Sequence, residues 1–152
     1  MADYSTSIEI HATPAEVFDY LVTAAGVTAW MGEHATLEPH VGGAFQVDIA
    51  GSPIRGQYLE VVRPHRVVVS WGVAGSGEFP SGTSRVSFTL SPTEQGTCVD
   101  VLHSELPESR MAGHVDGWAH FLPRLASVAE GESLPVDHWI PLSNEASRDQ
   151  LT

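Results

Sequence analysis

The stretch HVDGWAHFLPRLASVAEG, residues 114–131, decides the fold of this chain. It belongs to a predicted helix that begins near Glu108 and ends near Glu130. Apolar side chains recur there at steps of three and four residues, and such steps place them on one face of a helix. They are Met111, Val115, Trp118, Leu122, Leu125 and Val128. A long helix with one apolar face must pack against another layer of the protein.

Gly117 and Pro123 are unusual inside a helix, and Pro123 is expected to kink it. Gly117 costs on the order of 1 kcal/mol relative to alanine in a helix, and this cost is reasonable where the helix backbone must come close to a sheet. His114, Gly117 and Phe121 flank the apolar face. The helix is therefore expected to lie on a sheet, with these three residues at the margin of the contact.

The segments before this helix supply the other layer. Alternating apolar and polar residues predict a first strand over Tyr4–His11. Thr13, Pro14 and Glu16 then provide the N-cap, the first turn and the capping box of a short helix. A second short helix or turn ends near Gly32. Six strand-like stretches separated by turn residues follow, and they predict an antiparallel meander with the first strand at an edge.

This order of elements predicts an α+β helix-grip fold, in which a curved antiparallel sheet wraps around a long C-terminal helix and two short helices follow the first strand. A sheet curved around a helix often fails to close completely, and the gap can form a ligand pocket. The predicted domain covers residues 1–131. Residues 132–152 have little periodicity, and they are expected to form a tail that is at most partly ordered.

Composition limits the classes of partner. The 152 residues, 42% of them hydrophobic, suffice for one domain with a single core. Seven Lys and Arg against 19 Asp and Glu give a net charge of −12, which disfavours nucleic acids and insertion into membranes. No stretch resembles a signal peptide or a membrane span, and Cys98 is the only cysteine, so a cytoplasmic location is expected. His114 and His120 are six residues apart and cannot share a metal on one helix face, and we expect neither a metal nor a cofactor.

Alternation along the strands identifies the side chains that face the last helix. Phe88 points inward from the strand at residues 84–91, and Val101 and His103 point inward from the strand that follows. The strand at residues 54–62 cannot be oriented in this way. Together with the aromatic residues of the other elements, these side chains predict a mainly apolar pocket with a few polar groups. The candidate ligand-binding residues are Trp30, Phe45, Trp71, Phe88, Val101, His103, His114, Trp118, Phe121 and Leu122.

Four stretches carry a resemblance to a known family. They are WMGEHATLEPHVGGAFQVDI (30–49), GQYLEVVRPHRVVVSW (56–71), SRVSFTLSPTEQGTCVDVLHSELP (84–107) and HVDGWAHFLPRLA (114–126). Over about residues 5–131 the chain resembles the activator of heat-shock-protein-90 ATPase homologue family, within the START-like (SRPBCC) superfamily. The resemblance implies a helix-grip fold with a cavity between helix and sheet. Members of the superfamily bind lipids, sterols, polyketides or other hydrophobic molecules, and some catalyse cyclisation or hydrolysis. The family offers no universal catalytic residue.

Three functions follow from these observations. The first is binding of a small hydrophobic or aromatic ligand between the last helix and the sheet, with His103 or His114 offering a hydrogen bond. The second is an enzyme of the cyclase or hydrolase kind that uses the same cavity, in which one of these histidines performs acid–base chemistry. The third is a protein-interaction module, such as a chaperone regulator or a homodimer, which predicts an exposed apolar patch.

Overall fold

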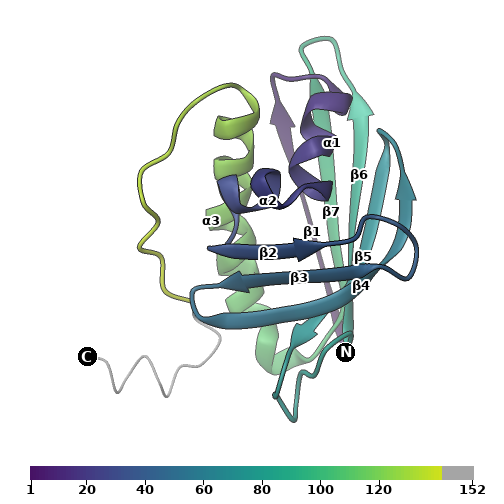
Figure 1. Ribbon diagram of the computed structural model, residues 1–152, viewed down its shortest axis with the longest axis vertical. Coiled ribbons are helices and arrows are strands. Elements are labelled where there is room, and N and C mark those ends of the chain that lie inside the picture. Colours follow the sequence, from purple (N-terminus) through teal and green to yellow (C-terminus); the bar gives the residue numbers. More distant parts are fainter. Residues whose placement is uncertain (142–152) are drawn as a thin grey trace.

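The structure is a computed structural model that describes residues 1–141 (Figure 1). Seven strands form one antiparallel sheet in the order β1-β7-β6-β5-β4-β3-β2, so the predicted meander and the edge position of β1 are confirmed. The α+β helix-grip fold is likewise confirmed. In chain order the elements are β1 (Ala2–Ile10), α1 (Pro14–Val22), α2 (Ala24–Trp30), β2 (His34–Leu37), β3 (Ala44–Ile49), β4 (Ser52–Val62), β5 (Arg66–Val73), β6 (Ser84–Pro92), β7 (Thr97–Leu106), the short 3-10 helix η1 (Glu108–Arg110) and α3 (Met111–Ala129).

The first helix begins where the sequence predicts. The Thr13 hydroxyl accepts a hydrogen bond from the Glu16 amide at 3.2 Å, and the Glu16 carboxylate accepts one from the Thr13 amide at 3.1 Å. This capping box satisfies two amides that would otherwise lack a partner at the start of the helix. The buried face of α1 is then directed into the core, where it packs beside α3 and β6.

The strand that alternation could not orient, β4, contains an irregularity. Tyr58 is buried and pairs with Val69, but Glu60 pairs with Val68, so the register shifts between Tyr58 and Glu60. A bulge of this kind moves the following side chains to the other face of the sheet. Val61 therefore packs against the core, although simple alternation from Tyr58 would have placed Glu60 there.

The long helix α3 lies on the concave side of a strongly bent sheet. Figure 1 shows β1, β6 and β7 running along the helix, whereas β2, β3 and β4 cross in front of it. Of the predicted apolar stripe, Trp118, Leu122, Leu125 and Val128 are buried, while Met111 and Val115 are half-buried at the end where α3 begins. The bend and the less buried helix end place a gap between α3 and the β3–β5 part of the sheet.

The chain turns back after α3. Residues 132–141, which we term the C-terminal segment, contain no helix or strand and return along the outside of α3 (Figure 1). Leu134 and Trp139 of this segment pack against the core. Residues 142–152 of the predicted tail lie outside the described residues. Within residues 1–141, no helix combines the length and the apolar character needed to cross a membrane.

Candidate ligand-binding pocket

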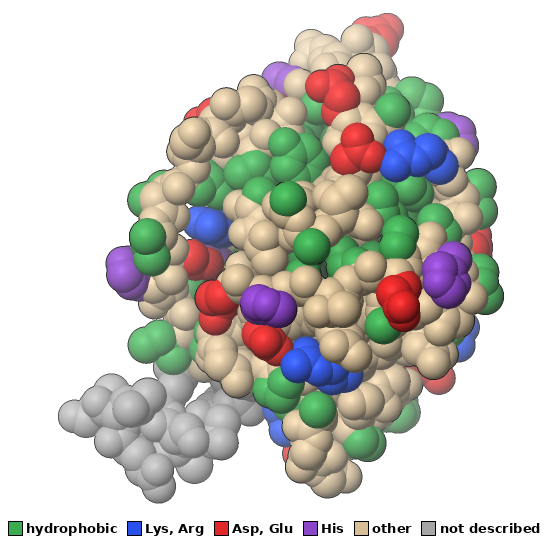
Figure 2. Space-filling view, viewed as in Figure 1, with side chains coloured by type: hydrophobic (Ala, Val, Ile, Leu, Met, Phe, Trp, Pro, Cys, Tyr) green, Lys and Arg blue, Asp and Glu red, His purple; other side chains and the backbone are tan. Residues whose placement is uncertain are grey.

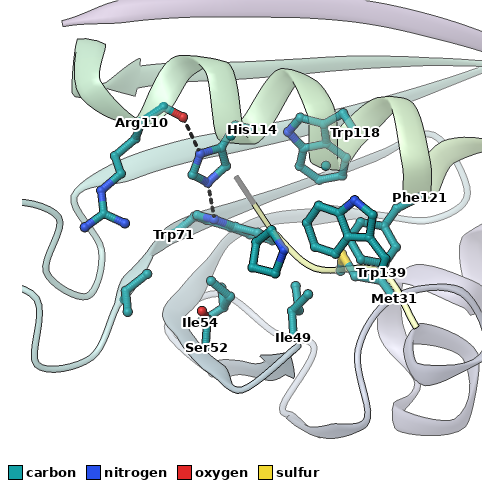
Figure 3. A pocket seen from close by; sticks show the side chains of 14 residues that line it. Met31, Ile49, Ser52, Ile54, Trp71, Arg110, His114, Trp118, Phe121 and Trp139 are labelled. Atoms are coloured by element: carbon teal, nitrogen blue, oxygen red, sulfur yellow. Dashed lines mark hydrogen bonds between the residues drawn. The ribbon is translucent and has the colours of Figure 1, made fainter. Parts of the chain in front are cut away.

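A pocket lies between α3, the bent part of the sheet and the C-terminal segment (Figure 3). Water-sized molecules could occupy about 90 Å³ of it, and the wider hollow, which includes open solvent, measures about 640 Å³. Most of the side chains around it are apolar or aromatic, which is typical of sites that bind small molecules. The pocket therefore occupies the place that the helix-grip architecture predicts.

Four of the ten candidate residues line this pocket: Trp71, His114, Trp118 and Phe121. The other six do not line it and are core residues: Trp30, Phe45, Phe88, Val101, His103 and Leu122. Alternation identifies which face of a strand a side chain occupies, but not which side chains on that face are covered by others. Phe45 illustrates the difference, because Tyr58 meets it edge-on at 5.7 Å between ring centroids. Ligand contact by any of the ten stays a prediction.

Trp30 is a core residue because it joins three helices. Its indole Nε1–H donates to the Tyr20 carbonyl oxygen of α1 at 2.9 Å, and its own carbonyl oxygen accepts from Arg124 Nε of α3 at 3.2 Å. A buried indole that already has a hydrogen-bond partner is well suited to a structural role. Trp30 therefore fixes α2 against α1 and α3.

His103 is fully buried and connects the sheet to α3. The Trp118 indole Nε1–H donates to His103 Nδ1 at 3.1 Å, and because an indole nitrogen only donates, the imidazole proton is on Nε2. Nε2–H then donates to Ser84 Oγ at 2.8 Å, and the Ser84 hydroxyl donates to the Trp71 carbonyl oxygen at 2.7 Å. Burial, followed by the nearby His114, holds the pKa of His103 well below its usual range. His103 is therefore a neutral residue that orients Trp118.

His114 lines the pocket and is also hydrogen-bonded at both ring nitrogens. The Trp71 indole Nε1–H donates to His114 Nε2 at 3.2 Å, so Nδ1 carries the proton and donates to the Arg110 carbonyl oxygen at 2.8 Å. Burial lowers the pKa of His114, and it outweighs the opposing effect of the bond to this carbonyl. The rings of His103 and His114 meet edge to face with centroids 4.7 Å apart. Two neutral histidines thus hold two pocket indoles in fixed orientations.

The glycine-rich loop between β5 and β6 contains an anchor that sequence reasoning missed. Phe79 is fully buried, and its ring meets His114 edge to face at 5.4 Å. The guanidinium carbon of Arg110 lies 5.6 Å from the centre of the same ring. One aromatic residue among glycines and serines was the only available signal. Phe79 supports the pocket from behind His114 and Arg110.

Apart from Trp71, the sheet side of the pocket was also missed. The missed residues come from the end of α2, the end of β3, the start of β4 and the end of β5. They are Met31, Ile49, Ser52, Ile54 and Val73. Ile49 belongs to a strand whose inward face alternation could assign. Ser52 and Ile54 belong to β4, whose faces alternation could not assign because of the bulge. The sequence therefore indicated the helix side of the pocket better than the sheet side.

The C-terminal segment forms the remaining wall. The Trp139 ring stacks on His120 with centroids 5.3 Å apart and 9° between the planes, and it meets Phe121 edge-on at 4.9 Å. Its Nε1–H donates to the Asp116 carboxylate at 3.2 Å. A Cβ atom at Gly117 would lie 3.6 Å from the Trp139 ring, and no atom of the sheet lies within 4 Å of that position. The reason expected for Gly117 was therefore wrong: its close neighbour is Trp139.

A second group of contacts anchors the same segment. The Asp137 carboxylate is 3.0 Å from His120 Nε2 and 3.7 Å from Arg124 Nε. Burial alone would raise the pKa of Asp137, but hydrogen bonds from His120 and from the Trp139 amide, together with the Arg124 charge, lower it. These contacts position Trp139 and Pro141 at the pocket. No periodic pattern indicated this wall.

Among residues 1–141, Arg110 is the only charged residue of the pocket lining. Its side chain is 19% exposed and lies at one end of the pocket, opposite Met31, Phe121 and Trp139 (Figure 3). Ser52 adds a hydroxyl to the lining. In the part of the chain that the structure describes, no three His, Cys, Asp or Glu side chains gather as a metal site would require. The pocket thus offers apolar walls, a neutral imidazole and one guanidinium.

Comparisons with known proteins agree with this architecture. A family model described as "Activator of Hsp90 ATPase homolog 1-like protein" matches residues 11–130. No curated protein matches the chain. The solution structure of an AHSA1-like protein from Rhizobium etli is 36% identical, covers 91% of this chain and 88% of its own, and has a TM-score of 0.73.

Two further structures are similar in fold at lower identity. A protein from Mesorhizobium loti is 22% identical, with coverage of 88% of this chain and 100% of its own and a TM-score of 0.77. The Aha1 dimer from Colwellia psychrerythraea is 23% identical, with coverage of 86% and 98% and a TM-score of 0.76. At this identity the likeness concerns the fold alone.

Proposed function

Because the chain belongs to the Activator of Hsp90 ATPase homolog 1-like family, we propose that it binds a small, mainly apolar molecule in the pocket between α3 and the sheet. The family and its fold leave the ligand open, since one fold supports many functions. The pocket's chemistry therefore carries the proposal.

The supporting observation is a set of aromatic rings around an apolar space. Trp71, Trp118, Phe121 and Trp139 come from three different parts of the chain and all line the pocket. The indoles of Trp71 and Trp118 are held by hydrogen bonds to neutral histidines, and that of Trp139 by Asp116. Rings that are already fixed lose little freedom when a ligand binds, which favours affinity. Apolar contact with such walls would supply most of the binding free energy.

The proposal is tested with N-phenyl-1-naphthylamine, a neutral dye whose emission rises in apolar surroundings. The variant Val73→Trp places a large side chain in the pocket and spares the fully buried core residues, because Val73 lines the pocket and is only half-buried against the core. Val62→Trp is the matched control, since Val62 is 48% exposed and does not line the pocket. We expect Val73→Trp to weaken dye binding at least tenfold and Val62→Trp to leave it unchanged. Equal affinity in the wild type and in Val73→Trp, with both folded, would refute the proposal.

A protein partner is the second candidate. The family description refers to activation of Hsp90 ATPase, and the Colwellia psychrerythraea structure is described as a dimer. Val136 and Ile140 of the C-terminal segment and Val41 before β3 are exposed apolar side chains. Sedimentation equilibrium would detect a homodimer, and a chaperone ATPase assay would detect regulation. A monomer without effect on the ATPase would remove this candidate.

The enzyme alternative depends on His114, because His103 does not line the pocket. Both nitrogens of His114 have hydrogen-bond partners, so no observation favours catalysis over binding. We propose a cytoplasmic location on the basis of sequence composition, and a single domain over residues 1–131 on the basis of its pattern of elements.

A further inference from the structure

We propose that the ligand of this pocket carries one anionic group, such as a carboxylate, and that the Arg110 guanidinium binds it. The inference rests on the proposed function, since it names the class of ligand for the same pocket. An apolar acid would lie with its charged end at Arg110 and its apolar body toward Phe121 and Trp139. Figure 3 shows Arg110 at one end of the pocket and these two rings at the other.

The first support is the state of the Arg110 side chain. Its closest carboxylate is Glu78, with Nε and Oε2 3.9 Å apart, and Nη2 is 3.4 Å from Ser76 Oγ. Glu78 is 55% exposed, and its carboxylate also accepts a hydrogen bond from the Ser109 hydroxyl. Nη1 has no hydrogen-bond acceptor among residues 1–141. The guanidinium therefore keeps donors for a planar anion, which arginine binds through two parallel hydrogen bonds.

The second support is the balance of charge around the pocket. The chain has a net charge of −12, and Figure 2 shows acidic side chains spread over one face with few basic ones among them. As far as the structure describes the chain, the pocket lining nevertheless contains an arginine and no carboxylate. The other titratable side chain that the described residues contribute to the lining is His114, which is neutral. Of the charges on residues 1–141, Arg110 is therefore the one that an anionic ligand would meet inside the pocket.

The third support is the low exposure of Arg110. Its stem passes His114, and its guanidinium lies over the ring of Phe79, so the charge is held against apolar surface. A charge that is partly removed from water interacts more strongly with an opposite charge than a fully solvated one does. Glu78 compensates this charge only loosely. A ligand carboxylate would compete with Glu78 for the same guanidinium.

The test compares two compounds with the same ring system and nearly the same size. 1-Naphthaleneacetate carries a carboxylate, and 1-naphthaleneacetamide carries a neutral amide in its place. Each is used to displace N-phenyl-1-naphthylamine from the full-length protein at low salt. We expect the acetate to bind at least tenfold more tightly than the amide, which corresponds to a typical charge-assisted hydrogen bond.

Arg110→Gln should abolish this preference, so that the acetate and the amide bind with the same affinity. The substitution spares the bond from His114, which is made to the backbone carbonyl of Arg110. Arg85→Gln is the matched control, because it removes the same charge from an exposed residue outside the pocket lining. Arg85→Gln should keep the preference. Equal loss in both variants would overturn the inference, because it would show an effect of net charge alone.

Glu78→Gln tests the same inference through an expected increase in the preference for the acetate. Removing the competing carboxylate should raise the preference for the acetate several-fold, a result that misfolding cannot produce. An unchanged or smaller preference in Glu78→Gln would count against a shared guanidinium. If the dye binds but wild-type protein does not distinguish the two compounds, the inference fails and the proposed function stands. If the dye itself does not bind, both fail.

Discussion

Ser84→Ala tests whether the buried network around His103 stabilises the fold. Ser84 is 2% exposed; its hydroxyl accepts from His103 Nε2–H at 2.8 Å and donates to the Trp71 carbonyl oxygen at 2.7 Å. The substitution removes one oxygen atom, so it creates almost no cavity. It leaves the His103 N–H buried without an acceptor, and such a group destabilises a protein by about 1–3 kcal/mol. We expect the free energy of unfolding to fall by about 2 kcal/mol.

The assay is urea unfolding followed by tryptophan fluorescence at pH 7.5. For a protein of this size the loss corresponds to a decrease in Tm of about 4–8 °C. Ser87→Ala on the same strand is the control, because Ser87 is 8% exposed and its hydroxyl makes no hydrogen bond to any described residue. This control should change the free energy by less than about 0.5 kcal/mol. If Ser84→Ala is as mild as Ser87→Ala, the network does not have the role assigned to it.

Three further predictions follow from the same structure. The pKa values of His103 and His114 are lowered from 6.5, so the unfolded chain takes up protons that the folded protein does not. The free energy of unfolding should therefore keep its full value above pH 6.5. At lower pH it should decrease, by up to about 1.4 kcal/mol per pH unit for each histidine. Urea titrations that coincide from pH 7 to pH 5 would contradict this. Gly117→Ala should raise Tm, because the new Cβ would make an ordinary contact with Trp139 at 3.6 Å, and alanine stabilises a helix by up to about 1 kcal/mol relative to glycine. A lower Tm would mean that α3 has no room for a Cβ atom at this position. Trp139→Ala should speed dissociation of N-phenyl-1-naphthylamine about tenfold in stopped-flow measurements, because an aromatic wall of the pocket is lost. His138→Ala, at the exposed neighbouring residue, should leave the dissociation rate unchanged. Equal rates in the two variants would exclude Trp139 from the binding wall.

The fold could be predicted because its signals are local or periodic. The capping box at Thr13 and Glu16 depends on a spacing of three residues, and the stripe on α3 depends on helical steps. The orientation of β4 could not be predicted, because the bulge after Tyr58 reverses the alternation within one strand. Local patterns therefore specified the elements, and failed where one residue changed the register.

The pocket could be predicted mainly on its helix side, and on the sheet side only at Trp71. Trp118 lies in the apolar stripe of α3 and Phe121 lies beside it, one turn further along, so helical periodicity was sufficient to identify them. Phe88 and Val101 satisfy the same kind of rule on their strands, but other side chains fill the space in front of them. Phe79 and Trp139 lie in segments without periodicity, and their burial depends on contacts distant in the sequence. Such contacts cannot be deduced from alternation.

The position of Trp139 bears on where the functional unit ends. The family match stops at residue 130, so a protein shortened to that boundary would keep all helices and strands of residues 1–141. It would lose Trp139 and Pro141, and the aromatic face of Phe121 would be open to water. We expect such a shortened protein to keep its secondary structure in circular dichroism, but to self-associate and to bind hydrophobic molecules nonspecifically. Screens for ligands should therefore use chains that extend at least through residue 141.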